Sequence, residues 1–425
     1  MRSLSFVLWT GVRNYKETQL YPASSGKGKT VAKTRGFHAV KITDDEMELK
    51  IKEHKRKKRK VCLYIVGAVL LTFLIVKLAI ALGSYDSYRV RSSSEIGTSN
   101  ASSFAGFKDY VLQYSNDGVV CMDAQGNLLW NQAFDMTNPR MDICGDYLIV
   151  YDQGGTEIYI LTESGLQKEM EMVMPIRTAC VAGQGSVAVL LEESDNSYVR
   201  LFDKNGEQLA GGQFYASEGG LPVDIALSSD AQKLAVDMID ISAGQVDSVI
   251  AFYNFGSVGK NEIDNNVGSF TYENTLIPEI DFLDANTMLA VGDSQIIVFE
   301  GSQKPQPKRT ITYKDTPKGI FHNDSYIGVI YDKGDEENTS TIEVFDTKGN
   351  SVMEHETSIL YEDVYLLDNN EICVLGQYSC ELFTIHSIQK FEQTFDEELK
   401  GFIYAGSLNN YIVVRSGIME QIKLR

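Results

Sequence analysis

The chain has 425 residues, of which 43% are hydrophobic, and its formal net charge is −19. This length and apolar content are enough for a substantial buried core. The charge is unevenly distributed, because residues 84–425 contain 22 Lys and Arg against 52 Asp and Glu. A domain with such an excess of negative charge repels phosphate backbones, which argues against nucleic-acid binding and favours solubility or cationic partners.

Residues 1–60 form a basic N-terminal tail. Residues 1–46 include a Ser-, Gly- and Lys-rich stretch and show no sustained hydrophobic period, so we expect them to be poorly ordered. Asp44 to Lys60 is charged and rich in good helix formers, which predicts a helix that continues into the apolar segment that follows.

Residues 61–82 read VCLYIVGAVLLTFLIVKLAIAL, with Lys77 as the single charge. Twenty-two helical residues at about 1.5 Å each span about 30 Å of bilayer hydrocarbon, which predicts one transmembrane helix. A cleaved signal peptide is the alternative, but its apolar region is usually about 7–15 residues long and lies near the start of the chain. Here sixty residues precede the segment, which favours a membrane anchor.

The flanks of this segment predict its orientation. Six consecutive cations stand directly before it, and few follow it, so the tail is expected in the cytoplasm and the C-terminal domain outside the cell membrane. The same cations are expected to contact anionic lipid headgroups, at about 1 kcal/mol each. They are Lys55, Arg56, Lys57, Lys58, Arg59 and Lys60.

Residues 83–103 are Ser-rich and are expected to be a flexible stalk. From residue 104 to residue 425 the pattern changes to short apolar runs separated by Asp, Asn and Gly turns, which predicts an all-β domain. A strand, a tight turn with Gly and a second strand recur along it at intervals of about forty residues, the period of a four-stranded propeller blade. The clearest copies are residues 119–130, 198–209 and 341–352.

Five weaker copies bring the total to eight, so we expect an eight-bladed propeller, with seven blades as the alternative. They are residues 157–168, 249–260, 295–306, 381–392 and 411–422. The last copy ends after three strands, so closure of the ring needs a fourth strand from the N-terminal side. Tyr88 to Ile96 and Phe104 to Tyr110 are the two candidates.

Residues 110–134 resemble the repeat of quinoprotein-like and WD-repeat-like propellers, on the strength of Asp123, Gly126 and Trp130. Asp203 with Gly206 and Asp346 with Gly349 match the turn alone, so the resemblance concerns architecture. The basic tail, one span, Ser-rich stalk and divergent propeller together are similar to uncharacterised single-pass membrane proteins of Gram-positive bacteria that contain a domain of unknown function. That resemblance implies no functional residues.

Residue patterns for catalysis and metal binding are missing from the sequence. His322, His355 and His386 stand in different repeats, and none is near a Cys or a second His at ligand spacing. The acidic stretches Asp332 to Asn338 and Asp237 to Asp247 lack the order of an EF-hand and are interpreted as solvated loops. We therefore predict no catalytic, cofactor-binding or metal-ligating residue, and no cofactor.

The five cysteines outside the apolar segment are expected to pack as small hydrophobic residues, with a Cys373–Cys380 disulfide as the alternative. With no catalytic motif, the sequence favours a non-enzymatic binding or scaffolding platform for a protein, peptide or cell-envelope ligand. The alternatives are an enzyme of the lactonase or quinoprotein type, with its active site where the blades converge, and an extracellular sensor.

Overall fold

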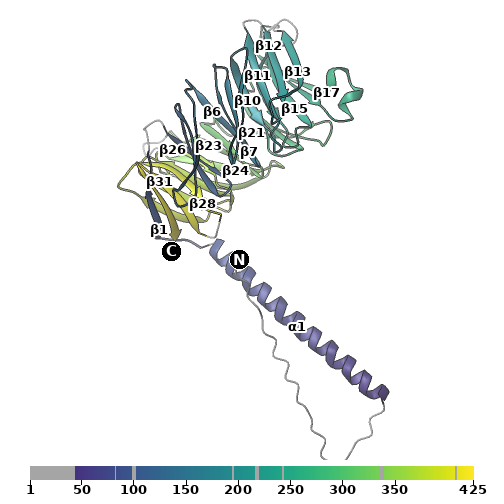
Figure 1. Cartoon of the computed structure of the whole chain (residues 1–425), viewed down its shortest axis with the longest axis vertical. Helices are drawn as coiled ribbons and strands as arrows, with labels where there is room; N and C mark the ends of the chain where they lie inside the picture. Colours follow the sequence, from purple (N-terminus) through teal and green to yellow (C-terminus); the bar gives the residue numbers. More distant parts are fainter. Residues whose placement is uncertain are drawn as a thin grey trace, which may run out of the picture. The chain divides into compact units, whose positions relative to one another are not determined.

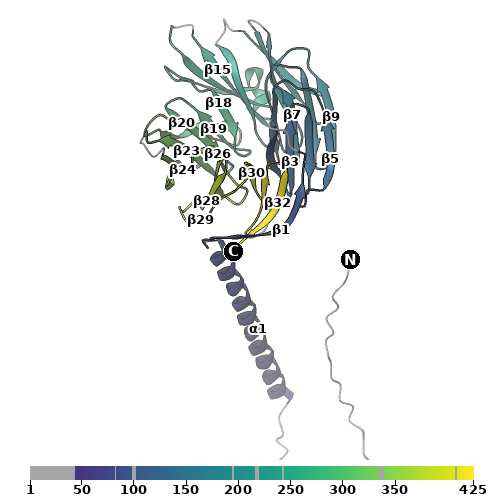
Figure 2. The same ribbon diagram turned by 90° about the vertical axis from the view of Figure 1, so that its left-hand side faces the viewer.

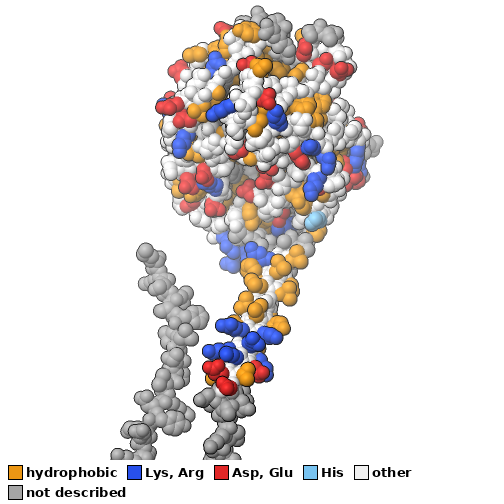
Figure 3. Space-filling view, turned by 90° about the vertical axis from the view of Figure 1, so that its right-hand side faces the viewer, with side chains coloured by type: hydrophobic (Ala, Val, Ile, Leu, Met, Phe, Trp, Pro, Cys, Tyr) orange, Lys and Arg blue, Asp and Glu red, His pale blue; other side chains and the backbone are white. Residues whose placement is uncertain are grey.

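The structure is a computed structural model, and it describes residues 44–81, 83–97, 102–193, 196–215, 220–241, 244–334, 339–406 and 409–425. Poor order is expected for residues 1–46, of which residues 1–43 lie outside these ranges. The acidic residues Asp335 to Asn338 lie outside them as well. A single helix, α1 (Asp44–Ala81), contains the stretch Ile51–Leu78, which is long and apolar enough to cross a membrane. Figure 3 shows hydrophobic side chains over much of α1 and Lys and Arg side chains beside them. The helix begins at Asp44, so the charged segment before residue 61 is helical as predicted.

The rest of the described chain forms eight four-stranded antiparallel sheets, the blades of a propeller (Figures 1 and 2). The prediction of an eight-bladed all-β propeller is therefore confirmed. Blade 1 contains β2 (Ser103–Phe107), β3 (Tyr110–Ser115), β4 (Gly118–Met122) and β5 (Leu128–Ala133). Blade 2 contains β6 (Pro139–Cys144), β7 (Tyr147–Asp152), β8 (Glu157–Thr162) and β9 (Gly165–Glu171). Blade 3 contains β10 (Ile176–Val181), β11 (Val187–Glu193), β12 (Asn196–Phe202) and β13 (Gln208–Tyr215).

The next three blades repeat this order, with two short 3₁₀ helices, η1 (Gly259–Asn261) and η2 (Ile263–Asn265), inserted in blade 4. Blade 4 contains β14 (Leu221–Leu227), β15 (Lys233–Asp240), β16 (Asp247–Asn254) and β17 (Asn266–Tyr272). Blade 5 contains β18 (Glu279–Phe282), β19 (Thr287–Val291), β20 (Gln295–Glu300) and β21 (Gln306–Thr312). Blade 6 contains β22 (Gly319–His322), β23 (Tyr326–Asp332), β24 (Ser340–Asp346) and β25 (Ser351–Thr357).

Blade 7 contains β26 (Tyr361–Leu366), β27 (Glu371–Gly376), β28 (Ser379–Thr384) and β29 (Gln389–Thr394). Blade 8 combines strands from the two ends of the domain. Blade 8 contains β30 (Leu399–Tyr404), β31 (Asn410–Arg415), β32 (Ile418–Leu424) and, from the N-terminal side, β1 (Tyr88–Glu95). Strand β1 pairs antiparallel with β32, so the first of the two candidate segments supplies the closing strand.

The expected stalk is thus wrong over much of its length, because β1 lies within residues 83–103 and the propeller begins before residue 104. The reason is physical. β1 is an outermost strand, where side chains are mostly exposed or half-buried and serine is tolerated. A Ser-rich composition therefore does not separate a flexible linker from an edge strand.

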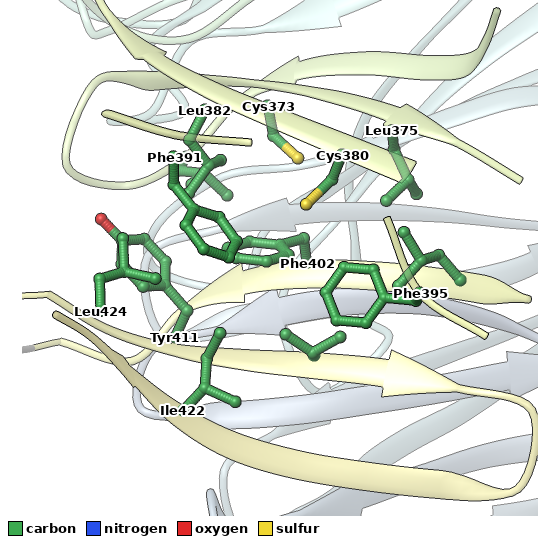
Figure 4. Close-up of a cluster of buried hydrophobic side chains, with 13 residues drawn as sticks. Cys373, Leu375, Cys380, Leu382, Phe391, Phe395, Phe402, Tyr411, Ile422 and Leu424 are labelled. Atoms are coloured by element: carbon green, nitrogen blue, oxygen red, sulfur yellow. The ribbon is translucent and has the colours of Figure 1, made fainter. Parts of the chain in front are cut away.

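Eight separate clusters of buried hydrophobic side chains lie between successive blades, and each combines residues of two neighbouring sheets. The cluster between blades 7 and 8 includes Phe391, Phe402 and Tyr411 (Figure 4). The cluster between blades 8 and 1 joins Met419 of β32 to Met122 of β4, so the ring is closed. Closure buries the core without leaving an unpaired blade.

The repeated turn has the structural role that its sequence predicts. Gly126, Gly206 and Gly349 adopt φ values of 81°, 82° and 78°, which favour glycine. The aspartate three residues earlier accepts backbone hydrogen bonds within the turn, as when Asp203 Oδ1 accepts from Asn205 N at 2.9 Å and Glu207 N at 2.8 Å. These hydrogen bonds lower the pKa of Asp203.

Candidate functional site in the central channel

The first strand of each blade lies innermost, where β10 contacts β6 and β14, and β14 contacts β18. An aspartate followed by a large apolar residue occurs on four of these strands. The four are Asp142 on β6, Asp224 on β14, Asp281 on β18 and Asp363 on β26. The ring therefore brings together carboxylates that lie far apart in the sequence.

Two cavities lie along these inner strands. The first has a volume of about 830 Å³ and is lined by residues of blades 2 to 5, including Asp142, Arg177, Asp224 and Asp281. The second has a volume of about 520 Å³ and extends to His322 of blade 6. Asp142 and Asp281 line both cavities, so the two adjoin. We call the space that they form the central channel.

Several of these side chains connect one blade to the next. Asp142 Oδ2 accepts a hydrogen bond from the backbone N–H of Val181 at 2.7 Å, and Asp224 Oδ2 accepts one from Ile280 at 2.8 Å. Arg177 Nε donates to the carbonyl oxygen of Val223 at 2.9 Å. The inner carboxylates are thus held in fixed positions by their own scaffold, which is a condition for selective recognition.

The electrostatics of the channel favour neutral carboxyl groups. Burial, and then the charges of neighbouring carboxylates such as Asp142 and Asp224, raise the pKa of Asp281 to about 8. Burial raises the pKa of Asp224 to about 7, and it also raises the pKa values of Asp142 and Glu279. About half of the Asp281 side chain is accessible to water. The surrounding channel wall and the neighbouring acidic groups nevertheless oppose its ionisation and so raise its pKa.

His322 is the histidine that the ring brings to this channel. Its Nε2 lies 3.8 Å from Asp281 Oδ2, and burial lowers the pKa of His322. His355 lies elsewhere, between blades 6 and 7, where Nε2 is 3.0 Å from Glu381 Oε1 and the ring stacks on Phe383. A neutral imidazole beside a carboxyl group can exchange a proton with it or with a ligand.

One acidic residue differs from its prediction. Asp237 was expected in a solvated loop, but it lies within β15, fully buried and directly opposite Asp224 of β14. Both of its carboxylate oxygens lack a side-chain hydrogen-bond partner, and burial raises its pKa to about 8. The strand extends to Asp240, which places residue 237 on the face of the blade that packs against its neighbour.

The cysteines follow the packing interpretation. Cys373 and Cys380 are both buried and unpaired, and they lie in the hydrophobic cluster between blades 7 and 8 (Figure 4). Within the described ranges, no group of three or more His, Cys, Asp or Glu side chains has the arrangement of a metal site. The channel offers carboxyl groups, the guanidinium groups of Arg140 and Arg177 and the imidazole of His322, a set suited to hydrogen bonding.

Sequence reasoning missed the channel residues because each stands alone in its own repeat. A signal was nevertheless present, since the segments Met141-Asp142-Ile143, Val223-Asp224-Ile225 and Ile280-Asp281-Phe282 occupy the same place in three blades. Acids at a repeated position of the innermost strands would be expected to lie near one another around the axis of the ring.

Comparison with solved structures relates this chain to propellers of low sequence identity. The C-terminal WD40 domain of Sif2 is 11% identical, with a TM-score of 0.54 over 81% of this chain and 100% of that chain. BamB from Moraxella catarrhalis is 13% identical, with a TM-score of 0.46 over 80% of this chain and 100% of that chain. The similarity to the Sif2 domain shows the propeller fold.

Comparison with curated proteins finds no match. A family model matches residues 81–424, which includes every strand of the propeller, and its description is a family of unknown function, DUF5711. The chain belongs to this family of unknown function.

Proposed function

We propose that this protein is anchored by α1 in the cell membrane, with its N-terminal tail in the cytoplasm, and that its propeller is a binding platform outside the cytoplasm. The helical stretch Ile51–Leu78, with its long apolar run, supports the anchor. The six cations from Lys55 to Lys60, directly before that run, support the orientation. The platform would dock a protein, a peptide or a cell-envelope polymer.

Exposed leucines on three consecutive blades carry the platform proposal. They lie at the start of the outermost strands, where Leu128 of β5 is 62% exposed, Leu166 of β9 is 47% exposed and Leu209 of β13 is 59% exposed. Trp130 Nε1 of β5 donates to the carbonyl oxygen of Glu163 at 3.0 Å, so the outer edges of blades 1 and 2 abut. Contiguous exposed apolar patches mark protein-interaction sites, and we infer that these three leucines belong to one such surface.

The topology is tested with two epitopes in intact cells, one at residue 20 and one after Arg425. Protease added outside should degrade the second and spare the first. Degradation of the first epitope alone would contradict the orientation, and loss of the residue-20 epitope from a shortened mature chain would identify a cleaved signal sequence.

The platform is tested by cross-linking the full chain in its native membrane and comparing Leu166→Glu/Leu209→Glu with the wild-type chain. We expect the cross-linked partner to be lost. Leu360→Glu is the matched control, because Leu360 is 78% exposed and lies between blades 6 and 7. Equal cross-linking by wild type and the double variant would contradict a docking role for this rim.

A second candidate function is an enzyme whose site is the central channel. The observation that favours it is the pair formed by His322 and Asp281, at 3.8 Å, at the junction of the two cavities. Screening the wild type and Asp281→Asn against lactones and other esters tests this candidate. Turnover that Asp281→Asn abolishes would support it, and turnover that is equal in both chains would rule out Asp281 as a catalytic residue.

A further inference from the structure

A groove with basic walls lies at the edge of blade 8, on the closing strand and its partner. Its volume is about 520 Å³, and it is lined by Arg89, Val90, Arg91, Lys423 and Arg425. Arg89 and Lys423 are directly opposite each other in the pairing of β1 with β32. We call Arg89, Arg91, Lys423 and Arg425 the blade 8 basic patch.

The cations of the blade 8 basic patch are available to a ligand. All four residues are exposed, and in the described part of the chain none of them forms an ion pair. Asp86 and Glu420 are the acidic residues nearest to them in the sequence, and Glu420 is paired with Arg415. Guanidinium groups bind phosphate oxygens in a bidentate manner, so adjacent arginines and a lysine form a site for phosphates.

The patch stands out because the domain around it is strongly acidic. Residues 84–425 have 30 more acidic than basic side chains, counting Asp and Glu against Lys and Arg. At physiological ionic strength, charges further away than about 8 Å are largely screened. A phosphate in the groove therefore experiences mainly the nearby cations rather than the net charge of the domain.

The covalent chain fixes where this patch can be relative to the end of α1. The helix ends at Ala81, and Tyr85 N already donates to the carbonyl oxygen of Lys390 at 2.8 Å, on the outermost strand of blade 7. Four Cα to Cα steps separate the two residues, a reach of at most about 15 Å. β1 begins three residues later, at Tyr88. The outer edge of blades 7 and 8 is therefore tethered close to the end of the apolar helix.

We propose that the blade 8 basic patch binds the phosphates of anionic lipids in the leaflet from which α1 emerges, so that the propeller rests on the membrane surface by one edge. This inference rests on the proposed membrane anchor. A propeller oriented in this way turns the opposite rim, away from blade 8, toward external ligands. The contact is distinct from the one predicted for Lys55 to Lys60, which lie before the apolar segment.

The test places the full chain in lipid nanodiscs that contain either 30% phosphatidylglycerol or phosphatidylcholine alone. A donor fluorophore is attached to the side chain introduced by Ser93→Cys, at an exposed position of β1, in a chain that also carries Cys62→Ser. An acceptor on the lipid headgroups reports, by energy transfer, how much of the population has β1 against the membrane.

We expect high transfer with anionic lipid, less with neutral lipid, and a decrease in 0.5 M salt. Each cation near an anionic surface changes the docking equilibrium about fivefold, so Arg89→Gln/Arg91→Gln/Lys423→Gln should lower it on the order of a hundredfold. The matched control is Lys168→Gln/Lys308→Gln/Arg309→Gln, which removes the same charge from exposed positions on β9 and β21. The control should dock as the wild type does.

Equal transfer in both lipids, or in the wild type and the patch variant, would overturn the proposal. A soluble poly(glycerol phosphate) added to neutral nanodiscs distinguishes the source of phosphate. If the polymer binds through the patch as tightly as the anionic leaflet does, the ligand is an envelope polymer and the lipid proposal is wrong. Alkaline extraction of the membranes reports on the anchor separately, because release of the chain would contradict the proposed anchor itself.

Discussion

Asp237 of β15 lies directly opposite Asp224 of β14, and both carboxyl groups face the interface between blades 4 and 5. Asp224 is tied to blade 5 through the backbone N–H of Ile280, whereas the Asp237 oxygens have no side-chain partner. Two neighbouring buried carboxyl groups cannot both ionise at low cost, so the pair titrates as a unit at a pH well above that of an ordinary aspartate.

The first prediction is a loss of stability as the pH rises. Burial raises the pKa of folded Asp237 to about 8, while in the unfolded chain it is about 3.9. Between these values the folded chain keeps a proton that the unfolded chain has released, so the free energy of unfolding falls as pH increases from about 4 to about 8. Asp237→Asn removes this titration and should stabilise the protein at pH 8 by up to about 5 kcal/mol, but not at pH 4.

Thermal unfolding of both chains from pH 2 to pH 8 measures this difference. Asp203→Asn is a control of opposite sign, because turn hydrogen bonds lower the pKa of Asp203. The stability that Asp203 contributes is present above the unfolded pKa and is lost as pH falls through the folded pKa. Parallel curves for wild type and Asp237→Asn would show that Asp237 ionises normally.

The second prediction concerns a buried ion pair within blade 7 that a tyrosine of blade 8 contacts. Lys390 and Glu371 are 3% and 5% exposed, Lys390 Nζ donates to Glu371 Oε1, and the Tyr411 hydroxyl donates to Glu371 Oε2. Lys390→Met leaves the carboxylate buried without its counter-charge, which should cost about 3–5 kcal/mol of unfolding free energy. Lys390→Met/Glu371→Gln should recover most of this loss. Urea unfolding of the single and double variants measures the coupling, and additive losses would contradict a paired role.

The third prediction concerns the closing strand. Two chains without α1 are compared, one that begins at Gly83 and one that begins at Ser102. The second lacks β1 and leaves β32 with an unpaired edge, which is a template for association with other chains. We expect the longer chain to be monomeric and the shorter one to oligomerise and to melt at a lower temperature. A shorter chain that is monomeric and equally stable would contradict the closure of blade 8 by β1.

The fourth prediction concerns the packing of a glycine against an aromatic ring in blade 6. Gly328 of β23 is paired with Phe321 of β22, and a Cβ at residue 328 would overlap the Phe321 ring. Gly328→Ala should therefore cost about 1–3 kcal/mol through overpacking, and Phe321→Leu should relieve part of that cost. Gly268→Ala in β17 is the matched control, since its new Cβ would meet the Phe270 ring at 3.4 Å, an ordinary contact. Equal unfolding free energies for the two alanine variants would show that the ring moves aside freely.

The propeller could be predicted from the sequence because its signal is local. Each blade repeats a strand, a turn such as Asp203 to Gly206 and a second strand, and the turn requires the residues that it contains. The same repeat shows that the last blade ends after three strands and needs a fourth from the N-terminal side. The sequence did not predict how far the closing strand extends, because Ser92 to Ser94 are equally compatible with a linker. Only their pairing with β32 makes them part of a strand.

The channel could not be assembled from the sequence, because its members are brought together only by the curvature of the ring. Asp142 and Asp281 belong to blades 2 and 5 and share both cavities, although 138 residues separate them along the chain. Asp237 illustrates a second limit. Its acidic neighbourhood in the sequence is typical of a solvated loop, but strand β15 continues through it and buries its side chain.

Blade 8 is built from both ends of the domain, and this limits the order in which the domain can fold during synthesis. β1 is synthesised before every other strand, whereas its partner β32 is the last, and more than 320 residues separate Glu95 from Ile418. Until the final segment has been synthesised, β1 has no β32 to pair with. The seven other sheets can form during this time. The joining of β1 to β32 is then the step that converts a row of blades into a ring, and its rate depends on how soon the two ends meet.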